Sequence, residues 1–177
     1  MKKSGWYQKK RDENNYNKEM EDLTILDYEE GMLDEMMQLF YDTVHTVNAR
    51  DYRKDQLNRW APLDVDKKFW QQRLKRNVCK VAFINNIMVG FTELEDEHVE
   101  TMYVHKDFQR RKVAANLIDE LLQIASERKY SVLTTEASVT AKPFFEAFGF
   151  QVTRVKKKLF NGKDFTNFQM TKDLSLC

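Results

Sequence analysis

Apolar residues recur with a period of two through much of residues 78–104, and this stretch constrains the fold more than any other part of the chain. Two runs, Val78–Ile84 and Ile87–Leu94, flank the pair Asn85-Asn86. Asparagine tolerates the left-handed conformation that a two-residue hairpin turn requires, so the pair predicts a tight turn between two strands. A third strand is expected over Val99–Val104. Together the three strands predict an antiparallel meander.

The longest helical pattern follows the meander, over residues 113–128. Its apolar stripe has helical spacing and contains no Gly or Pro; it consists of Ala114, Leu117, Ile118, Leu121, Leu122 and Ala125. Before the meander, a short strand is expected at Leu23–Leu26. That strand leads into three helical patterns, over residues 33–44, 53–60 and 66–76.

Shorter elements complete the pattern. They are a strand at Val132–Thr135, a helix at Thr140–Phe148 that Gly149 ends, and two strands over 151–159 and 165–171 that the turn Asn161-Gly162 joins. Strands mixed with helices in this order predict an α/β (α+β) fold. We expect a mixed, mostly antiparallel central sheet of six to seven strands, flanked by helices. Residues 1–20 are polar and lack apolar periodicity, so we expect a disordered extension before a single domain over 21–177.

Composition argues against several classes of function. The 29 basic and 28 acidic residues nearly cancel, which disfavours a protein that gathers nucleic acid or anionic membrane through its overall field. The basic run at 154–158 alternates between two faces of its predicted strand, so it forms no continuous patch for nucleic acid. No apolar stretch approaches the roughly 20 residues that span a bilayer. The cysteines, Cys79 and Cys177, form neither a disulfide framework nor a metal cluster. We therefore expect a cytoplasmic protein without metal.

A basic loop leads from the third strand into the long helix. A helix start offers unpaired backbone N–H groups and a positive dipole end, which suits a phosphate or pyrophosphate. Lys106, Arg110, Arg111 and Lys112 add positive charge at this point. The alternative is a solvated basic surface loop, because runs of charge commonly lie on the surface. Composition alone leaves both open.

Two motifs in sequence order carry a resemblance to a known family. Gln109-x-x-Lys112-x-Ala114 precedes the long helix, and residues 141–150, which end in Gly149-Phe150, follow the next strand. This arrangement resembles the acyl-CoA-dependent N-acyltransferases of the GNAT superfamily, most closely its small bacterial acetyltransferases. The resemblance is strongest over 78–172, weaker over 23–46, and implies transfer of an acetyl group from acetyl-CoA to an amine.

The resemblance also implies which residues hold acetyl-CoA. Backbone groups of Met102, Tyr103 and Val104 would pair with its pantetheine arm, as in strand addition. The pyrophosphate would lie against the loop formed by Gln109, Arg110, Arg111, Lys112, Val113 and Ala114. Lys112 stands where the family pattern has glycine. We expect Lys112 to adopt an ordinary helical conformation and to contact phosphate; the alternative is that its side chain crowds the cofactor.

The implied chemistry requires a base, because an amine attacks a thioester only after it loses a proton. Period-two alternation predicts that His98, Glu100, Met102 and Val104 share one face of their strand. Glu100 is the first candidate for the base and His98 the second; Glu93 and Glu136 are further options. Each carboxylate has the alternative of facing solvent or a basic residue.

The acid and the acceptor are less constrained. Phe145 matches a position where many relatives have a tyrosine that protonates the departing thiolate, so Tyr103 or water would serve, or no acid is required. Ser138 replaces a frequent asparagine and suits a helix cap. These departures leave a non-catalytic acyl-CoA-binding module or sensor as the rival function. The acceptor, a small-molecule or peptide amine, would bind residues within 31–76 and 151–168, and the final hairpin offers an edge for a homodimer.

Overall fold

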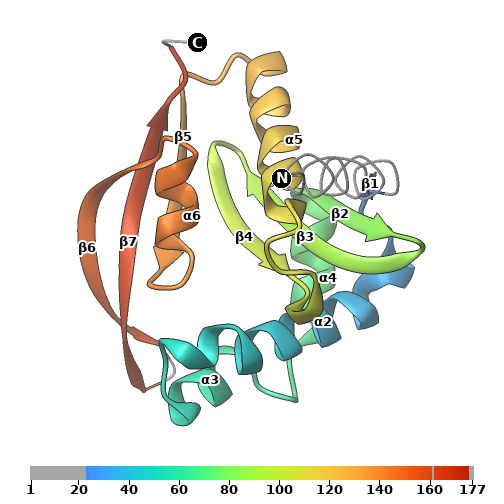
Figure 1. The fold of residues 1–177 in the computed structure, drawn as a ribbon, viewed down its shortest axis with the longest axis vertical. Helices are drawn as coiled ribbons and strands as arrows, with labels where there is room; N and C mark the ends of the chain where they lie inside the picture. The colour runs from blue at the N-terminus through green and yellow to red at the C-terminus, as the bar shows by residue number, and fades with distance from the viewer. Residues whose placement is uncertain (1–22, 161, 176–177) are drawn as a thin grey trace, which may run out of the picture.

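The computed structural model describes residues 23–160 and 162–175, and these residues form a sheet whose strand order is β1-β2-β3-β4-β5-β7-β6 (Figure 1). Only β4 and β5 pair in parallel, so the described sheet is mostly antiparallel, as predicted. The expected extension at residues 1–20 lies outside the described residues. The strands are β1 Leu23–Asp27, β2 Val78–Ile84, β3 Ile87–Glu95, β4 His98–Val104, β5 Val132–Ser138, β6 Gln151–Phe160 and β7 Lys163–Asp173.

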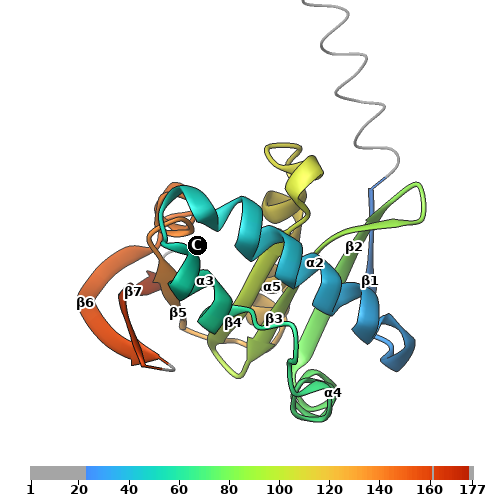
Figure 2. The same cartoon turned by 90° about the horizontal axis from the view of Figure 1, so that it is seen from below.

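The helices cover both faces of the sheet. They are α2 Leu33–Thr46, α3 Lys54–Trp60, α4 Lys67–Arg76, α5 Val113–Glu127 and α6 Lys142–Ala147, with short 3-10 turns η1 Glu30–Met32, η2 Asn48–Arg50 and η3 Lys106–Phe108. Figure 2 shows α2 and α3 on one face and α5 on the other. The apolar stripe of α2, including Met36, Phe40 and Val44, packs against Val81 and Phe91 of the sheet. In the described ranges, no helix is long and apolar enough to cross a membrane.

The tight turn between β2 and β3 is confirmed. Asn85 and Asn86 have φ angles of 51° and 63°, so both occupy the left-handed region that a two-residue hairpin turn of this type requires. At the final hairpin, Gly162 has a φ of 76°, while Asn161 lies outside the described residues. β6 forms the outer edge of the sheet and exposes Val155 and Leu159. The homodimer stays a prediction.

The start of α5 lies directly against β3 at Gly90. A Cβ atom at this glycine would come within 2.9 Å of both the backbone oxygen of Tyr103 and Cγ1 of Val113, and within 3.3 Å of Leu117. Real Cβ atoms do not approach backbone that closely, so the absence of a side chain lets the helix dock. This contact fixes the loop before α5 relative to the end of β4.

The sheet opens between β4 and β5. Within the described chain these strands pair only at His98 with Thr134 and at Val99 with Thr135, and then they diverge (Figure 1). The later part of β4 therefore has an edge to which β5 does not bond. Where two neighbouring strands of a sheet diverge, the backbone N–H and C=O groups of the free edge can pair with a ligand.

Candidate active site

The opening between β4 and β5 leads into a cavity of about 1020 Å³. Both strands, the loop before α5 and helix α6 line it, and Thr43, Trp60 and Phe165 close it on the side of α2 and α3. The structure thus brings most of the predicted site residues to one cavity; those that line it are His98, Glu100, Met102, Tyr103, Val104, Gln109, Arg110, Lys112, Val113, Ala114, Glu136 and Phe145. Arg111 and Glu93 are predicted site residues that do not line it.

The free edge of β4 is defined by its hydrogen bonds. His105 N–H donates to the carbonyl of Val89 on β3, and an antiparallel ladder alternates its bonds, so Met102 and Val104 direct their backbone groups toward the opening. The Val104 carbonyl is already occupied, because Thr43 Oγ1 donates to it at 3.0 Å and Gln109 Nε2 at 2.6 Å. Among the residues that the structure describes, none bonds to the backbone groups of Met102 or to the N–H of Val104, and these groups can bind a ligand.

Thr43 was not predicted as part of the site, although a signal was present. It is a buried threonine within the otherwise apolar stripe of α2. Its hydroxyl connects this helix to the end of β4. Gln109 belongs to the loop predicted to lie against pyrophosphate, and its side chain holds this loop to the end of β4 by donating to the carbonyls of Val104 and His105.

The prediction for Lys112 is wrong: this residue is not in an ordinary helical conformation. It has a φ of 61° and caps the start of α5 in the left-handed region, where the family pattern has glycine. Arg110 is also left-handed, with a φ of 62°. Left-handed residues in such a loop make successive backbone N–H groups converge into an anion-binding concavity, here at the positive end of a 15-residue helix.

Arg111 does not line the cavity. Its guanidinium carbon lies 4.9 Å from the centre of the Phe108 ring, in the geometry of a cation–π contact. Arg110 and Lys112 are therefore the basic loop residues that line the cavity. Of the basic residues predicted to add charge at the start of the long helix, Arg110 and Lys112 bring theirs to the cavity.

A bulge in β4 changes which side chains share a face. Thr101 pairs with Glu93 and Val99 pairs with Leu94, so Glu100 is an extra residue between them. Met102 and Val104 pack on the α5 side, as Val99 does. The prediction that His98, Glu100, Met102 and Val104 share one face is therefore wrong.

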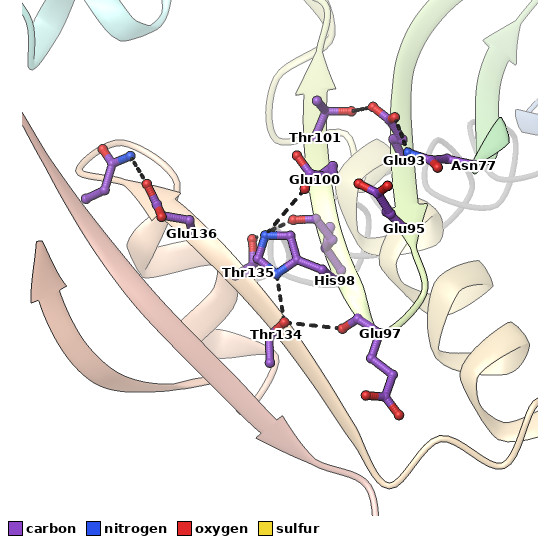
Figure 3. Close-up of polar contacts among 12 residues, drawn as sticks. Asn77, Glu93, Glu95, Glu97, His98, Glu100, Thr101, Thr134, Thr135 and Glu136 are labelled. Carbon is purple, nitrogen blue, oxygen red and sulfur yellow. Dashed lines mark hydrogen bonds and ion pairs between the residues drawn. The ribbon is translucent and has the colours of Figure 1, made fainter. Parts of the chain in front are cut away.

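His98 and Glu100 come together on the opposite face, toward α2 and α3. His98 Nε2 lies 3.9 Å from Glu100 Oε1, and the His98 Nδ1 lies 2.7 Å from Thr134 Oγ1 (Figure 3). The side chains of His98 and Glu100 are 36% and 34% exposed, so both are accessible from the cavity. The two first candidates for the base thus form a pair, and Thr134 is a member of the site that sequence analysis missed.

The other two carboxylates have structural partners. Glu93 is fully buried and accepts hydrogen bonds from Arg73 at 2.7 Å, Asn77 at 2.8 Å and Thr101 at 3.4 Å. A buried ion pair of this kind compensates a charge and leaves little capacity for a reacting proton. Glu136 lines the cavity, where it accepts from Lys156 at 3.2 Å and from Asn167 at 2.8 Å.

The candidate acids differ in their surroundings. Phe145 is 3% exposed and packs against Phe150, so it belongs mainly to the core beneath α6. The hydroxyl oxygen of Tyr103 accepts a hydrogen bond of 3.2 Å from Trp60 Nε1, and burial raises the Tyr103 pKa. Ser138 accepts from the Ala141 N–H at 3.1 Å and thereby stabilises the turn that leads into α6.

The loop after α2 closes one end of the cavity. Thr140 Oγ1 donates to Asp51 at 2.7 Å, and the Val139 N–H donates to the Tyr52 hydroxyl at 2.9 Å. The hydrogen bond from Thr140 is the main reason why the pKa of Asp51 is lowered. These bonds join the segment before α3 to the β5–α6 connection. Within the described ranges, no three His, Cys, Asp or Glu side chains gather into a metal site.

Comparisons with known proteins agree with this geometry. A sequence model described as "Acetyltransferase (GNAT) domain" matches residues 48–172. An uncharacterized N-acetyltransferase of Escherichia coli (strain K12), YafP, is 32% identical over 151 residues, which span 85% of this chain and 96% of that protein.

Solved structures share the fold. A GCN5-related N-acetyltransferase from Rhodopseudomonas palustris matches with a TM-score of 0.82 and 29% identity, over 85% of this chain and 95% of that one. The structure of yncA from Salmonella typhimurium, a putative acetyltransferase solved with its cofactor acetyl-CoA, matches with a TM-score of 0.66 and 17% identity. That match covers 87% of this chain and 95% of the other.

Proposed function

This chain belongs to the GNAT superfamily and is an acyl-CoA-dependent acyltransferase, and from that premise we propose that it acetylates a primary amine by direct attack on the thioester of acetyl-CoA. The acceptor is the amine of a small molecule or a peptide. The observation that carries the proposal is the free edge of β4, which leads directly from the His98–Glu100 pair to the concave loop before α5.

The residues present fit a CoA thioester at two places. The backbone groups of Met102 and the N–H of Val104 suit an extended amide-containing arm, which would add to β4 as a strand does. The left-handed residues Arg110 and Lys112 direct backbone N–H groups and positive charge to where a pyrophosphate would lie. The thioester supplies an activated acetyl group.

Three side chains provide the proton transfers. An ammonium cannot attack a carbonyl, so the His98–Glu100 pair removes a proton from the acceptor nitrogen. Tyr103 donates a hydrogen bond toward the departing sulfur, because its raised pKa keeps its hydroxyl protonated. On the acceptor side, Trp60 and Phe165 offer aromatic surface to the body of an amine.

We place the reaction in the cytoplasm, since a buried free thiol such as that of Cys79 suits a reducing compartment. Calorimetric titration of the purified protein with acetyl-CoA, with CoA for comparison, tests the first half of the proposal. We expect a dissociation constant in the micromolar range, roughly 1–100 μM.

Thiol release in the presence of lysine, spermidine, an aminoglycoside and a peptide with a free N-terminus tests the second half. Release that depends on one of these amines supports acetyl transfer. Tight binding of acetyl-CoA without thiol release for any amine would instead indicate the non-catalytic acyl-CoA-binding module. An absence of acetyl-CoA binding would contradict both the acetyltransferase and the binding module.

A further inference from the structure

We infer that Nε2 of His98 is the atom that takes the proton from the acceptor amine, and that Thr134 is the positioning residue that directs this nitrogen's lone pair into the cavity. This inference rests on the proposed function and specifies its proton-transfer step. It gives the two members of the His98–Glu100 pair different roles: His98 takes the proton, and Glu100 accepts hydrogen bonds from the ammonium and then from the imidazolium. Thr134 and Glu100 lie on opposite sides of the imidazole ring, as Figure 3 shows.

The first contacts lie on the Nδ1 side of the ring. Thr134 Oγ1 is 2.7 Å from His98 Nδ1 and 3.4 Å from the carbonyl oxygen of Glu97. In the proposed arrangement the hydroxyl of Thr134 donates its proton to the Glu97 carbonyl, which can only accept, and the hydroxyl lone pair faces the ring. His98 then donates its Nδ1–H to Thr134. A neutral imidazole carries one proton, and Nε2 is left with the lone pair.

The backbone keeps this arrangement in place. The N–H of Thr134 also donates to Glu97 O, at 2.8 Å, so hydroxyl and amide of one residue share a single carbonyl. Thr134 faces His98 across the short stretch where β4 and β5 remain paired. The ring is therefore held at the point where the sheet begins to open, with one nitrogen toward β5 and the other toward the cavity.

The third contact lies on the Nε2 side. The 3.9 Å between Nε2 and Glu100 Oε1 is too long for a hydrogen bond between them. The nitrogen of a bound acceptor amine can form hydrogen bonds to Nε2 and to Oε1 at the same time, because each hydrogen bond spans about 2.9 Å. An ammonium has three donors and can use two of them here. The bulge at Glu100 leaves His98 and Glu100 on one face of β4 and turns Met102 and Val104 to the other face.

His98 Nε2 accepts one proton of the ammonium, and the freed lone pair of the amine nitrogen forms a C–N bond to the acetyl carbon while the C–S bond breaks. The sulfur leaves with the electron pair and takes the proton of the Tyr103 hydroxyl, and a second proton of the amine nitrogen returns to that hydroxyl oxygen. Both N–H groups of the resulting imidazolium face acceptors, namely Thr134 and Glu100, so its positive charge is stabilised until its proton returns to solvent.

Nitrogen NMR tests the inference without any acceptor. The full chain labelled with 15N-histidine contains three histidines, and a His98→Gln variant identifies the signals of His98. At about pH 8, where imidazole is mostly neutral, we expect the two-bond correlations of an Nδ1–H tautomer. Thr134→Val keeps the branched shape and removes the acceptor, and should shift His98 to a mixture of tautomers. Thr134→Ser should restore the original pattern.

His45 and His105 serve as internal references for the fold, because their signals should stay unchanged in these variants. An Nε2–H tautomer at His98 in the unaltered protein would overturn the inference. So would an unchanged tautomer in Thr134→Val. Neither result depends on acetyl-CoA, so both are distinguishable from a failure of the proposed function, which would show as missing binding or missing thiol release.

Kinetics add a second readout, with the amine that supports thiol release in the panel above. Thr134→Val should lower kcat about 10-fold, since part of a general base's contribution is lost with the tautomer, and should leave the KM for acetyl-CoA unchanged. Thr153→Val, on β6 and away from the cavity, removes a hydroxyl that donates to the carbonyl of Gln169 on β7, and should leave kcat unaltered. A loss of kcat in Thr134→Val with its tautomer intact would reduce Thr134 to a structural role.

Discussion

The indole Nε1 of Trp60 donates a hydrogen bond of 3.2 Å to the hydroxyl oxygen of Tyr103, and both residues line the cavity. The bond joins the last residue of α3 to β4. It leaves the hydroxyl's own proton for a second partner. Because burial raises the pKa of Tyr103, this proton stays on the oxygen at neutral pH. The pair therefore presents a hydrogen-bond donor in the cavity where Phe145 offers none.

Tyr103→Phe should lower kcat and leave binding of acetyl-CoA nearly unchanged. The phenyl ring keeps its packing against Phe40 and Phe91, whose ring centres lie 4.9 and 5.6 Å away. Loss of an acid in proton transfer costs a factor of about 100 or more, and loss of a single hydrogen bond about 10. Steady-state kinetics and calorimetry measure the two effects. Tyr130→Phe, at the far end of α5, is the control; equal kcat in both variants would mean that water serves instead of Tyr103.

The raised pKa of Tyr103 also predicts a loss of stability in alkali. In the unfolded chain a tyrosine releases its proton near pH 10. The folded protein retains this proton to higher pH, so the free energy of unfolding falls as the pH rises above about 10. Urea denaturation at pH 9 and pH 11 should show a smaller fall for Tyr103→Phe than for the unaltered chain. Tyr28 and Tyr52, whose pKa values burial also raises, contribute equally to both proteins. An equal fall in the free energy of unfolding between pH 9 and pH 11 for Tyr103→Phe and the unaltered chain would contradict this prediction.

Glu93 should matter for stability rather than for chemistry. Glu93→Gln leaves the guanidinium of Arg73, only 17% exposed, without its charge partner, and should cost about 3 kcal/mol in the free energy of unfolding. Glu95→Gln breaks the exposed pair with Arg76 and should cost less than about 1 kcal/mol. Denaturant unfolding separates the two. A stable Glu93→Gln protein that has lost turnover would instead make Glu93 the base.

Local repetition explains how much of the fold was predictable. The periods of two and 3.6 are set by neighbouring residues, so the meander, the stripe of α5 and the hairpin turn at Asn85-Asn86 could be read along the chain. The bulge at Glu100 could not, because it exists only in the pairing of β4 with β3. One extra residue then reversed the face of every side chain after it.

The same distinction applies to the site. The loop before α5 carries a contiguous motif, and its residues gathered at the cavity as expected. Thr134 acts on His98 across 36 residues of sequence, with no motif that joins the two. The conformation of Lys112 did have a signal: the family pattern has glycine at this position, and glycine marks a left-handed backbone. Lys112 therefore adopts the left-handed conformation that the glycine of the family pattern would adopt at this position.

Gly90→Ala should destabilise the protein and weaken acetyl-CoA binding together. The added Cβ meets a backbone oxygen and Val113 at 2.9 Å, so the start of α5 must move away from β3. Overpacking of this kind costs about 1–3 kcal/mol. Gly31→Ala is the matched control, because a Cβ there meets no atom within 4 Å. Thermal unfolding and calorimetry measure both effects; a Gly90→Ala protein with unaltered binding would show that the loop keeps its position without this contact.

Lys112 and Lys129 allow strain and ligand contact to be separated, because they are left-handed lysines at opposite ends of α5, with φ angles of 61° and 57°. Replacing either by glycine relieves a backbone conformation that costs a residue with a Cβ about 1 kcal/mol, so both variants should gain a similar, small amount of stability. Their effects on acetyl-CoA should differ. Lys112→Gly removes a positive charge beside the expected pyrophosphate and should weaken binding about 5-fold, while Lys129→Gly should leave it unchanged. Lys112→Glu should weaken binding further, by about 100-fold, through repulsion of the phosphates. Tighter binding by Lys112→Gly than by the unaltered protein would mean that the lysine side chain obstructs the cofactor, the alternative that its position in the loop leaves open.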